Sequence, residues 1–437
     1  MARFGGLSLP AATAVAALLV AYLALFPALF ALAVRLVAHH RGPGVALAAA
    51  PFAWIASEYG RLALFGGFPW VLLGYSQVTI LPVAQLASVS GVFGLSGLLA
   101  AGSAALSWPV LDRGPRRWWP AAGMLVCVAG VAAWGTSRVA GERLLAAGRP
   151  LSVGIVQANV RQDQKWDPGL ADEIFERYLR LTRKVIAEGA ELVLWPESAT
   201  PFSFAQSAEG AIVGQLARDA GVSILLGSDL WEPGSPARLY NAAFLVQPDG
   251  AIGGVYRKVR LVPFGEYVPF QRVLFFAAPL VQAVSDFEAG SVVNPLPLDG
   301  GLISTAICYE VVYPGLIREG VLNGSQLLTT ITNDAWFGRS SAASQHFAMA
   351  SMRAIEQGRY LVRSANTGIS GVVDPYGRVR ARSDLFVEYT TVDQVRLLDQ
   401  STVYGRMGDA PVWLSLGVTA LALLHRTRPR TGRGQGL

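Results

Sequence analysis

Cys308 stands at the end of an apolar run, 302–307, whose composition is typical of a buried β-strand. It is one of two cysteines, and Glu310 follows it by two positions. A free cysteine is usually a small apolar filler, because a thiol becomes reactive only where its surroundings favour the thiolate. We expect the chain to turn at the Pro314-Gly315 pair that comes next. The position alone leaves two interpretations open, a packing residue and a nucleophile.

A carboxylate follows a second apolar strand. Residues 191–195 run into Pro196 and Glu197, so Glu197 stands at the carboxyl end of a strand, where α/β sheets gather active groups. By itself, such a glutamate is more often a solvated loop residue. A nucleophilic cysteine needs a base, however, because a thiol with a pKa of about 8.5 is mostly protonated at neutral pH. A Cys-His pair would have to rely on His346, which we disfavour, so strand-end carboxylates are the remaining candidates.

The lysines are few, and one of them is informative. The chain has three, Lys165, Lys184 and Lys258, against 33 arginines. A lysine that persists in such a chain is a candidate for a site that needs a compact ammonium rather than a bidentate guanidinium. Lys258 lies at the end of a predicted hairpin strand beside Arg257 and Arg260, which already supply positive charge. We therefore treat Lys258 as a candidate functional cation.

Other kinds of chemistry lack their residues in this sequence. Two distant cysteines and four histidines, three of them at the ends of apolar blocks, supply no zinc-binding spacing. The sequence has no phosphate-binding glycine loop followed by Lys-Ser/Thr and no Gly-x-Ser-x-Gly elbow. It also has no basic stripe interleaved with aromatic residues. We expect no metal, no cofactor and no nucleic-acid partner.

The composition is that of a membrane protein. Hydrophobic residues make up 52% of the 437 positions and charged residues 15%, against about 25% charged in ordinary soluble domains. Apolar blocks lie at residues 9–37, 45–64, 81–111, 120–134 and 411–424. Each approaches or exceeds the roughly 20 residues needed to cross a bilayer, although the last two are shorter. The first is too long for a signal-peptide core and further blocks follow it, so we predict an integral membrane protein.

Arginines orient the predicted spans. They follow the first span, lie between the third and fourth, and follow the last, at Arg35, Arg41, Arg113, Arg116, Arg117, Arg426, Arg428, Arg430 and Arg433. If these sites are cytoplasmic, the positive-inside rule is met and the long middle segment lies outside the cytoplasm, on a multi-pass protein of the cell (inner) membrane. We predict a bundle of about four spans at 1–137, an extracytoplasmic catalytic domain at 138–408, and a span with a basic cytoplasmic tail at 409–437. The same count puts the N-terminus outside, so we expect either that upstream spans are missing from this chain or that its true start lies earlier.

Between residues 138 and 408 the sequence has the pattern of a soluble α/β domain. Strands are predicted at 151–160, 191–195, 223–229, 302–307, 326–333 and 360–366, and helices at 169–188, 208–220 and 341–357. Two hairpins are predicted, one joining 240–247 to 251–258 and one turning at 374–377. Because hairpins interrupt the alternation of strands and helices, we expect mixed sheets with helices on their outer faces.

Four motifs carry a family resemblance: LWPES, YRKVRLVPFGEYVPF, ICYEVVYP and TNDAWFG. In this order they resemble the carbon–nitrogen hydrolase (nitrilase) superfamily and, together with the flanking spans, its apolipoprotein N-acyltransferase family. The similarity covers most of the chain, including GFPWVLLGYSQ at 67–77 and TVYGRMGD at 402–409. It implies an α-β-β-α sandwich embedded between transmembrane helices, with a Glu-Lys-Cys triad. Such acyltransferases usually carry more spans before the domain than the four counted here.

The resemblance also implies roles for individual residues and a reaction. Glu197 would be the general base, Lys258 the cationic stabiliser and Cys308 the nucleophile. Further active-site positions would be Glu266, Tyr309, Glu310 and, in a motif near the substrate, Trp336. The implied reaction transfers a fatty acyl group from a phospholipid, through a Cys308 thioester, to the N-terminal amine of S-diacylglyceryl-cysteine on an apolipoprotein, the last step of lipoprotein maturation. The implied partners are that phospholipid, the lipoprotein acceptor and the bilayer.

Two other functions compete with this one. A membrane-tethered amidase or nitrilase would cleave a small carbon–nitrogen substrate, for which five spans are an excessive anchor. A membrane scaffold on an inactive hydrolase fold is disfavoured because all three triad residue types are present. The apolar segment 270–284, which begins four residues after Glu266, is either a core segment or a membrane-touching lid over the thioester, and we favour the lid.

Overall fold

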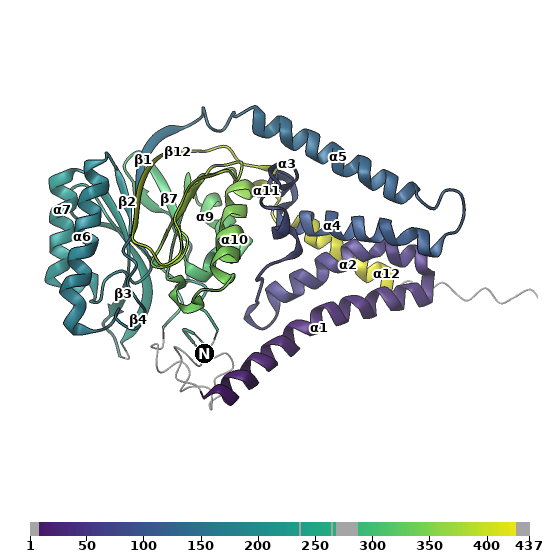
Figure 1. Cartoon of the computed structure of the whole chain (residues 1–437), viewed down its shortest axis with the longest axis horizontal. Helices are drawn as coiled ribbons and strands as arrows, with labels where there is room; N and C mark the ends of the chain where they lie inside the picture. The colour runs from purple at the N-terminus through teal and green to yellow at the C-terminus, as the bar shows by residue number, and fades with distance from the viewer. Residues whose placement is uncertain (1–7, 236, 264, 268–286, 425–437) are drawn as a thin grey trace, which may run out of the picture.

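The computed structural model describes residues 8–424 apart from 236, 264 and 268–286. The lid predicted at 270–284 and the basic tail after residue 424 therefore lie outside the described residues. The segment between the apolar helices contains two six-stranded sheets (Figure 1).

The first sheet contains β1 (Arg149–Gln157), β2 (Leu192–Leu194), β3 (Ser223–Glu232), β4 (Arg238–Val246), β5 (Ile252–Arg257) and β12 (Tyr389–Leu397), in the order β12-β1-β2-β3-β4-β5. The second contains β6 (Leu296–Leu298), β7 (Gly301–Ile307), β8 (Leu327–Thr332), β9 (Leu361–Ala365), β10 (Gly371–Val373) and β11 (Val379–Arg382), in the order β11-β10-β9-β8-β7-β6. In each sheet the parallel strands, β1 to β3 and β7 to β9, are flanked by antiparallel neighbours. The prediction of mixed sheets is confirmed.

The sheets pack against each other through apolar side chains, among them Ile155 and Leu194 from the first and Ile303 and Ile331 from the second. Helices α6 (Ala171–Ala187) and α7 (Ala208–Ala220) cover the outer face of the first sheet, and α9 (Pro314–Leu322) and α10 (Ala342–Gln357) lie against the second (Figure 1). The central strands β2 and β8 are buried on both faces, and β2 is apolar throughout, whereas β8 also buries threonines. These layers form the predicted α-β-β-α sandwich, and the fold class is confirmed.

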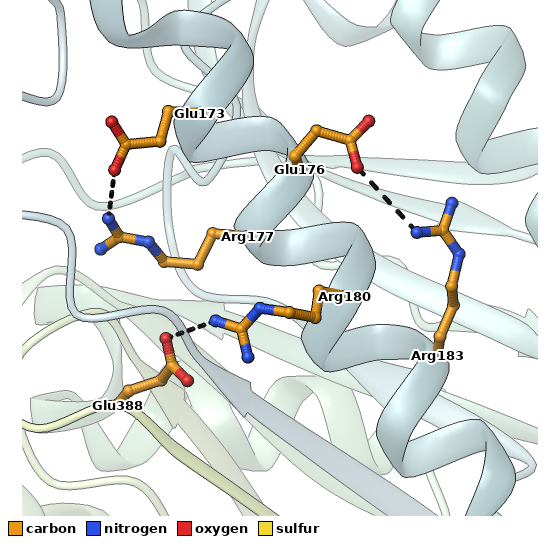
Figure 2. A pocket seen from close by; sticks show the side chains of 6 residues that line it. All are labelled: Glu173, Glu176, Arg177, Arg180, Arg183 and Glu388. Atoms are coloured by element: carbon orange, nitrogen blue, oxygen red, sulfur yellow. Dashed lines mark hydrogen bonds and ion pairs between the residues drawn. The ribbon is translucent and has the colours of Figure 1, made fainter.

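The outer side of α6 is charged, whereas its inner side buries Ile174, Tyr178 and Leu181. A groove of about 660 Å³ lies on this outer side. Figure 2 shows that three arginines in it each face a glutamate. The pairs are Arg177–Glu173 at 2.9 Å, Arg180–Glu388 at 2.8 Å and Arg183–Glu176 at 4.0 Å. Because the arginines and glutamates neutralise one another, we assign no ligand to this groove.

Several elements differ from the sequence predictions. The expected turn at Pro314-Gly315 is wrong: Pro314 begins α9, because proline suits the first turn of a helix, where its missing N–H is not needed. Two strands were not predicted, β6, which is only three residues long, and β12. The polar sequence of β12 is explained by its place at the edge of the first sheet, where most of its side chains are partly exposed.

Among the described helices, three are long and apolar enough to cross a membrane: α1 (Leu9–Arg41), α4 (Ala87–Leu111) and α5 (Trp119–Ala140). Leucines on α1 and α5, such as Leu18 at 70% and Leu125 at 72%, are exposed, as expected for a surface that faces lipid. The chain is therefore a membrane protein.

The other two predicted spans are not among these three helices. The second forms α2 (Pro43–Ala63), whose apolar character is broken by Glu58 and Arg61. The last forms α12 (Ala410–Leu424), which has 15 residues. Both pack with α1 and α4 (Figure 1). The predicted total of five spans stays a prediction.

The block predicted as one span at 81–111 is divided. A single turn, α3 (Leu81–Ala84), precedes α4, and Gly91 interrupts the first turns of α4 with a φ of 65°. A side chain here would be strained, and a Cβ at this position would lie 2.6 Å from the ring of Tyr404. Glycine thus lets the start of α4 bend closely against the segment that leads to α12.

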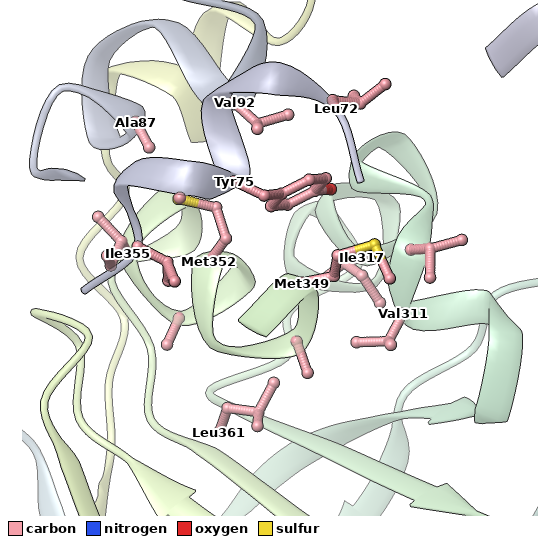
Figure 3. Close-up of a cluster of buried hydrophobic side chains, with 14 of the residues drawn as sticks. Leu72, Tyr75, Ala87, Val92, Val311, Ile317, Met349, Met352, Ile355 and Leu361 are labelled. Carbon is pink, nitrogen blue, oxygen red and sulfur yellow. The ribbon is translucent and has the colours of Figure 1, made fainter. Parts of the chain in front are cut away.

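The membrane part and the sandwich share one hydrophobic cluster (Figure 3). Tyr75 and Val92 from the membrane part pack with Met349, Met352 and Ile355 of α10. Polar contacts cross the same boundary. Arg353 donates to the Tyr75 hydroxyl at 2.7 Å, and the Glu356 carboxylate accepts from the Val92 N–H at 2.8 Å. Helix α10 therefore fixes the sandwich against the apolar helices.

Candidate active site

Glu197, Lys258 and Glu266 form a buried network of charges. The Lys258 ammonium lies 3.1 Å from Oε1 of Glu197 and 2.8 Å from Oε1 of Glu266. Asn241 donates through Nδ2 to the same two oxygens, at 2.7 Å and 3.0 Å. Lys258 is 1% exposed and each glutamate 7%. A buried ammonium shared by two carboxylates is held by charge and by hydrogen bonds, so its position is well defined.

Glu197 is placed by both sheets. It follows β2, and its Oε2 accepts from the backbone N–H of Asn333, which follows β8 in the second sheet, at 2.9 Å. The close approach to β3 requires glycine, because a Cβ at Gly227 would lie 2.7 Å from the Cα of Glu197. The carboxylate thus stands where the carboxyl ends of β2 and β8 meet.

Cys308 is the first residue of a short 3-10 helix, η6 (Cys308–Val312), directly after β7. Its φ of 54° is in the left-handed region, which a non-glycine residue occupies at a cost of roughly 1 to 3 kcal/mol. The thiol is buried and lies near Glu197, Lys258 and the Thr332 hydroxyl. A strained backbone at a buried strand end is a frequent property of residues that do chemistry.

Glu310 links the segments that carry Lys258 and Cys308. One of its oxygens accepts from the Tyr256 hydroxyl at 2.8 Å and from the backbone N–H groups of Val259 and Arg260 at 2.7 and 3.0 Å. The other accepts from the Ile307 N–H at 2.7 Å. Glu310 is fully buried, and burial raises its pKa to about 7 against the effect of these donors. It therefore holds the framework of the site together.

The electrostatics separate the three triad candidates. Burial and the Glu197 carboxylate raise the pKa of the Cys308 thiol, so the resting thiol is protonated. Burial disfavours the charged forms of Glu197 and Lys258, but the attraction between the two charges outweighs the effect of burial. The pKa of Glu197 is therefore lowered and the pKa of Lys258 is raised. The arrangement offers an ionised carboxylate beside a protonated thiol and a permanent cation. These are the parts needed for nucleophilic attack on a carbonyl carbon.

The two aromatic candidates are placed differently. Tyr309 follows Cys308 in η6, is buried, and stacks on Trp70 with ring centroids 6.4 Å apart. Trp336 lies on η7 (Asp334–Phe337), three residues after Asn333, and is 42% exposed. Tyr309 is thus part of the same turn as the thiol, and its ring contacts the membrane part. The role of Trp336 near a substrate stays a prediction.

Several residues at the site were not predicted from the sequence. Asn241, inside β4, and Asn333, directly after β8, bind the carboxylates described above, and a single asparagine is too common in a sequence to give a signal. Lys165 is the exception, because it is one of only three lysines. It is buried, donates to the backbone carbonyl of Glu197 at 3.2 Å, and has its pKa lowered to about 8 by burial.

Comparison with known proteins gives the family. A family model described as carbon-nitrogen hydrolase matches residues 152–400, and one described as apolipoprotein N-acyltransferase N-terminal domain matches residues 1–105. The apolipoprotein N-acyltransferase of Geobacter metallireducens is 38% identical over 436 residues, covering 97% of this chain and 83% of that protein. The chain belongs to the apolipoprotein N-acyltransferase family.

A second relative and one solved structure are also similar to this chain. The apolipoprotein N-acyltransferase of Methylococcus capsulatus is 37% identical over 440 residues, covering 98% of this chain and 84% of that protein. Among solved structures, a carbon–nitrogen hydrolase from Helicobacter pylori is 16% identical with a TM-score of 0.43, covering 64% of this chain and 95% of that one. The identification of the family from the four motifs and the flanking spans is confirmed.

In this member of the apolipoprotein N-acyltransferase family, the membrane part reaches the site through Trp70. Its indole N–H donates to the Gln345 side chain at 2.7 Å, and its ring lies between Tyr309 and His346, with a centroid distance of 5.5 Å to the latter. Within the described residues, no group of three or more His, Cys, Asp and Glu side chains is arranged to hold a metal ion.

Proposed function

We propose that this protein transfers a fatty acyl group from a phospholipid to the N-terminal amine of an S-diacylglyceryl-cysteine on an apolipoprotein. The observation that carries the proposal is the convergence of Cys308, Glu197 and Lys258 from both sheets, in a chain of the apolipoprotein N-acyltransferase family. The names of the relatives support the acceptor, and the exposed leucines of α1 and α5, which suit contact with lipid, support a membrane lipid as the donor.

The first half of the reaction acylates the enzyme. The Cys308 sulfur attacks the ester carbonyl carbon while Glu197 accepts the thiol proton. Because the pKa of the thiol is raised, the proton transfer has to accompany the attack. The tetrahedral intermediate carries an oxyanion, which the Lys258 ammonium and the Tyr309 backbone N–H stabilise. When the carbon–oxygen ester bond breaks, Glu197 gives the proton to the departing lysophospholipid hydroxyl. A Cys308 thioester remains.

The second half transfers the acyl group. The neutral amine of the acceptor attacks the thioester carbonyl, and the same cation and N–H stabilise the second oxyanion. Glu197 accepts the amine proton and returns it to the departing Cys308 sulfur. An amide bond replaces the thioester, and the enzyme is restored. In this proposal Glu266 and Asn241 keep the Lys258 ammonium charged and directed at the site.

The proposal includes a location. We place the protein in the cell (inner) membrane with the sandwich, 138–408, on the extracytoplasmic side. Arg35 and Arg41 at the end of α1, and three arginines at 113–117 between α4 and α5, support this orientation, because basic loops stay in the cytoplasm. The acceptor amine and the outer-leaflet phospholipid would then both be on the side of the site.

Mass spectrometry of the purified full chain tests this function. After incubation with phospholipid, we expect an acyl adduct on a peptide that contains Cys308 and release of lysophospholipid. Addition of a diacylglyceryl-cysteine peptide should remove the adduct and acylate the peptide's amine. A Cys127→Ala variant serves as the matched control, since Cys127 lies on α5 among exposed side chains. An adduct from small amides but none from phospholipid would contradict the proposal and favour a membrane-tethered amidase.

A further inference from the structure

A buried histidine contacts the nucleophile's backbone and has no part in the reaction described above. His346, on α10, is fully buried, and its Nε2 lies 3.1 Å from the backbone carbonyl oxygen of Cys308. Its Nδ1 lies 3.0 Å from Oδ1 of Asp334 and 3.0 Å from a guanidinium nitrogen of Arg363. All three side chains are 0% exposed.

The charges of this cluster determine which hydrogen His346 carries. Arg363 donates to Oδ2 of Asp334 at 2.8 Å, so these two residues form a buried ion pair without net charge. A proton added to His346 would leave a net positive charge in a fully buried cluster, which is unfavourable. The ring is therefore neutral. Because the Cys308 carbonyl only accepts, the single hydrogen is on Nε2, and Nδ1 accepts from Arg363.

The partner of Asp334 Oδ1 is consistent with this assignment. The Thr332 hydroxyl donates to it at 2.9 Å, so the carboxylate does not depend on a hydrogen from His346. Trp70 covers the ring from the membrane part, at a centroid distance of 5.5 Å. The imidazole is thus fixed on several sides, and its Nε2–H is aimed at one carbonyl group.

The carbonyl that His346 binds belongs to the peptide unit joining Cys308 to Tyr309. A trans peptide unit is planar, with its C=O and N–H pointing in opposite directions. A hydrogen bond that fixes the Cys308 C=O toward α10 therefore also fixes the Tyr309 N–H away from α10. In Figure 1 the first sheet, from which Lys258 comes, lies on the opposite side of the second sheet from α10, so an N–H directed away from α10 is directed toward the first sheet. Donation to the C=O also polarises the peptide unit and strengthens its N–H as a donor.

We propose that His346 is a positioning residue for the oxyanion site: through the Cys308 carbonyl it orients and polarises the Tyr309 N–H that receives the developing negative charge. The inference rests on the proposed function in that it concerns the same acyl transfer. It also assigns a purpose to the left-handed φ of Cys308, since a turn this strained needs an external hold on its peptide plane. Asp334 and Arg363 set the tautomer that makes His346 a donor.

Two variants of equal side-chain length separate this role from packing. His346→Gln keeps an N–H near the position of Nε2, whereas His346→Met fills the same space without a donor. Each is prepared as the full chain in a Cys127→Ala background, and its melting temperature is measured. Three reactions of Cys308 are then followed by mass spectrometry: acylation by phospholipid, acylation by a p-nitrophenyl ester, and alkylation by iodoacetamide.

The three reactions differ in what they require. Both acylations pass through an oxyanion. Alkylation does not: sulfur bonds to a CH₂ carbon, iodide leaves, and the thiol proton goes to the base. Loss of a direct oxyanion donor slows acyl transfer by about 100- to 1,000-fold, so misorienting one should slow both acylations of His346→Met by about 10- to 100-fold. We expect alkylation to keep its wild-type rate and His346→Gln to restore most of the acylation.

Equal slowing of alkylation and acylation in His346→Met would overturn the inference, because it would place the effect on the thiol or on the fold. Full acylation by His346→Met would also overturn it. The proposed function can fail separately. If the parent Cys127→Ala protein reacts with the p-nitrophenyl ester but not with phospholipid, the proposed substrate is wrong. The rates at which His346→Met and His346→Gln react with the p-nitrophenyl ester still decide the role of His346.

Discussion

The backbone N–H of Asn333 donates to Oε2 of Glu197 at 2.9 Å, and this bond joins the second sheet to the carboxylate carried by the first. The other oxygen of Glu197 is bound by Lys258 and Asn241. The base is therefore held on both oxygens by groups from different strands. The position of Glu197 does not depend on the Lys258 ammonium alone. A mutation can therefore remove the charge of Glu197 while its side chain keeps its place.

Glu197→Gln tests the base. The amide nearly keeps the shape and can still accept from Asn333, but it cannot take the thiol proton, so acylation of Cys308 should fall by about 100- to 10,000-fold. Cys308→Ala should abolish the adduct completely. Adduct formation by mass spectrometry is the measurement, with Glu191→Gln as a matched control at the exposed start of the same strand segment. A covalent acyl-enzyme in Cys308→Ala would disprove the assigned nucleophile.

Lys258→Arg tests the compact ammonium. The charge is kept, but a planar guanidinium does not fit between two carboxylates 2.8 and 3.1 Å from the lysine nitrogen, so we expect a large loss of acylation with the fold intact. Lys184→Arg on the exposed side of α6 is the matched control and should be silent. Acylation rates and melting temperatures are compared. Near-normal turnover would show that Lys258 contributes only a positive charge and that the compact ammonium is not required.

Glu310→Gln should mainly weaken the fold. The carboxylate accepts from four donors, and a hydrogen bond to a charged group contributes about 1.5 to 3 kcal/mol, whereas the amide presents one oxygen and an NH₂ that faces N–H groups. We expect a lower melting temperature together with lost acylation. Glu319→Gln, on the exposed side of α9, is the control. Unchanged melting with lost acylation would instead place Glu310 in direct contact with substrate.

Lys165 predicts a dependence of stability on pH. Burial lowers its pKa from 10.5 to about 8, so the folded protein releases this proton while the unfolded chain still holds it. Between these two pKa values the unfolded state binds more protons, and stability rises with pH. Relative to Lys165→Met, the wild type should therefore gain melting temperature from about pH 8 to about pH 10. A constant difference over this range would show that Lys165 has its ordinary pKa.

Much of the sandwich could be predicted because its strands are apolar runs closed by recognisable turns. The hairpins at 248–250 and 374–377 are examples, as are the buried strands that end at Glu197 and Cys308. Strand β12 could not be predicted, because an edge strand with partly exposed faces lacks both an apolar run and strict alternation. The helix after Pro314 was missed because a proline-glycine pair also signals a turn.

At the site, the residue types were easier to predict than their partners. Cysteine, lysine and glutamate stood out by rarity or by position at a strand end. Glu310 was expected at the site, but sequence spacing did not show that its carboxylate binds backbone groups on both sides. His346 was considered only as a possible base for the thiol. Its actual contact is with the carbonyl of Cys308, which depends on how α10 packs and is not encoded in local pattern.

The shared hydrophobic cluster of Figure 3 limits how such a protein can be recombined. A sandwich cut out at the predicted boundaries would expose Met349, Met352 and Ile355 to water and would deprive Glu356 of the Val92 N–H. A different set of apolar helices would have to offer the same complementary surface. Gene fusions that exchange the membrane anchor would therefore disturb the helix that also carries His346.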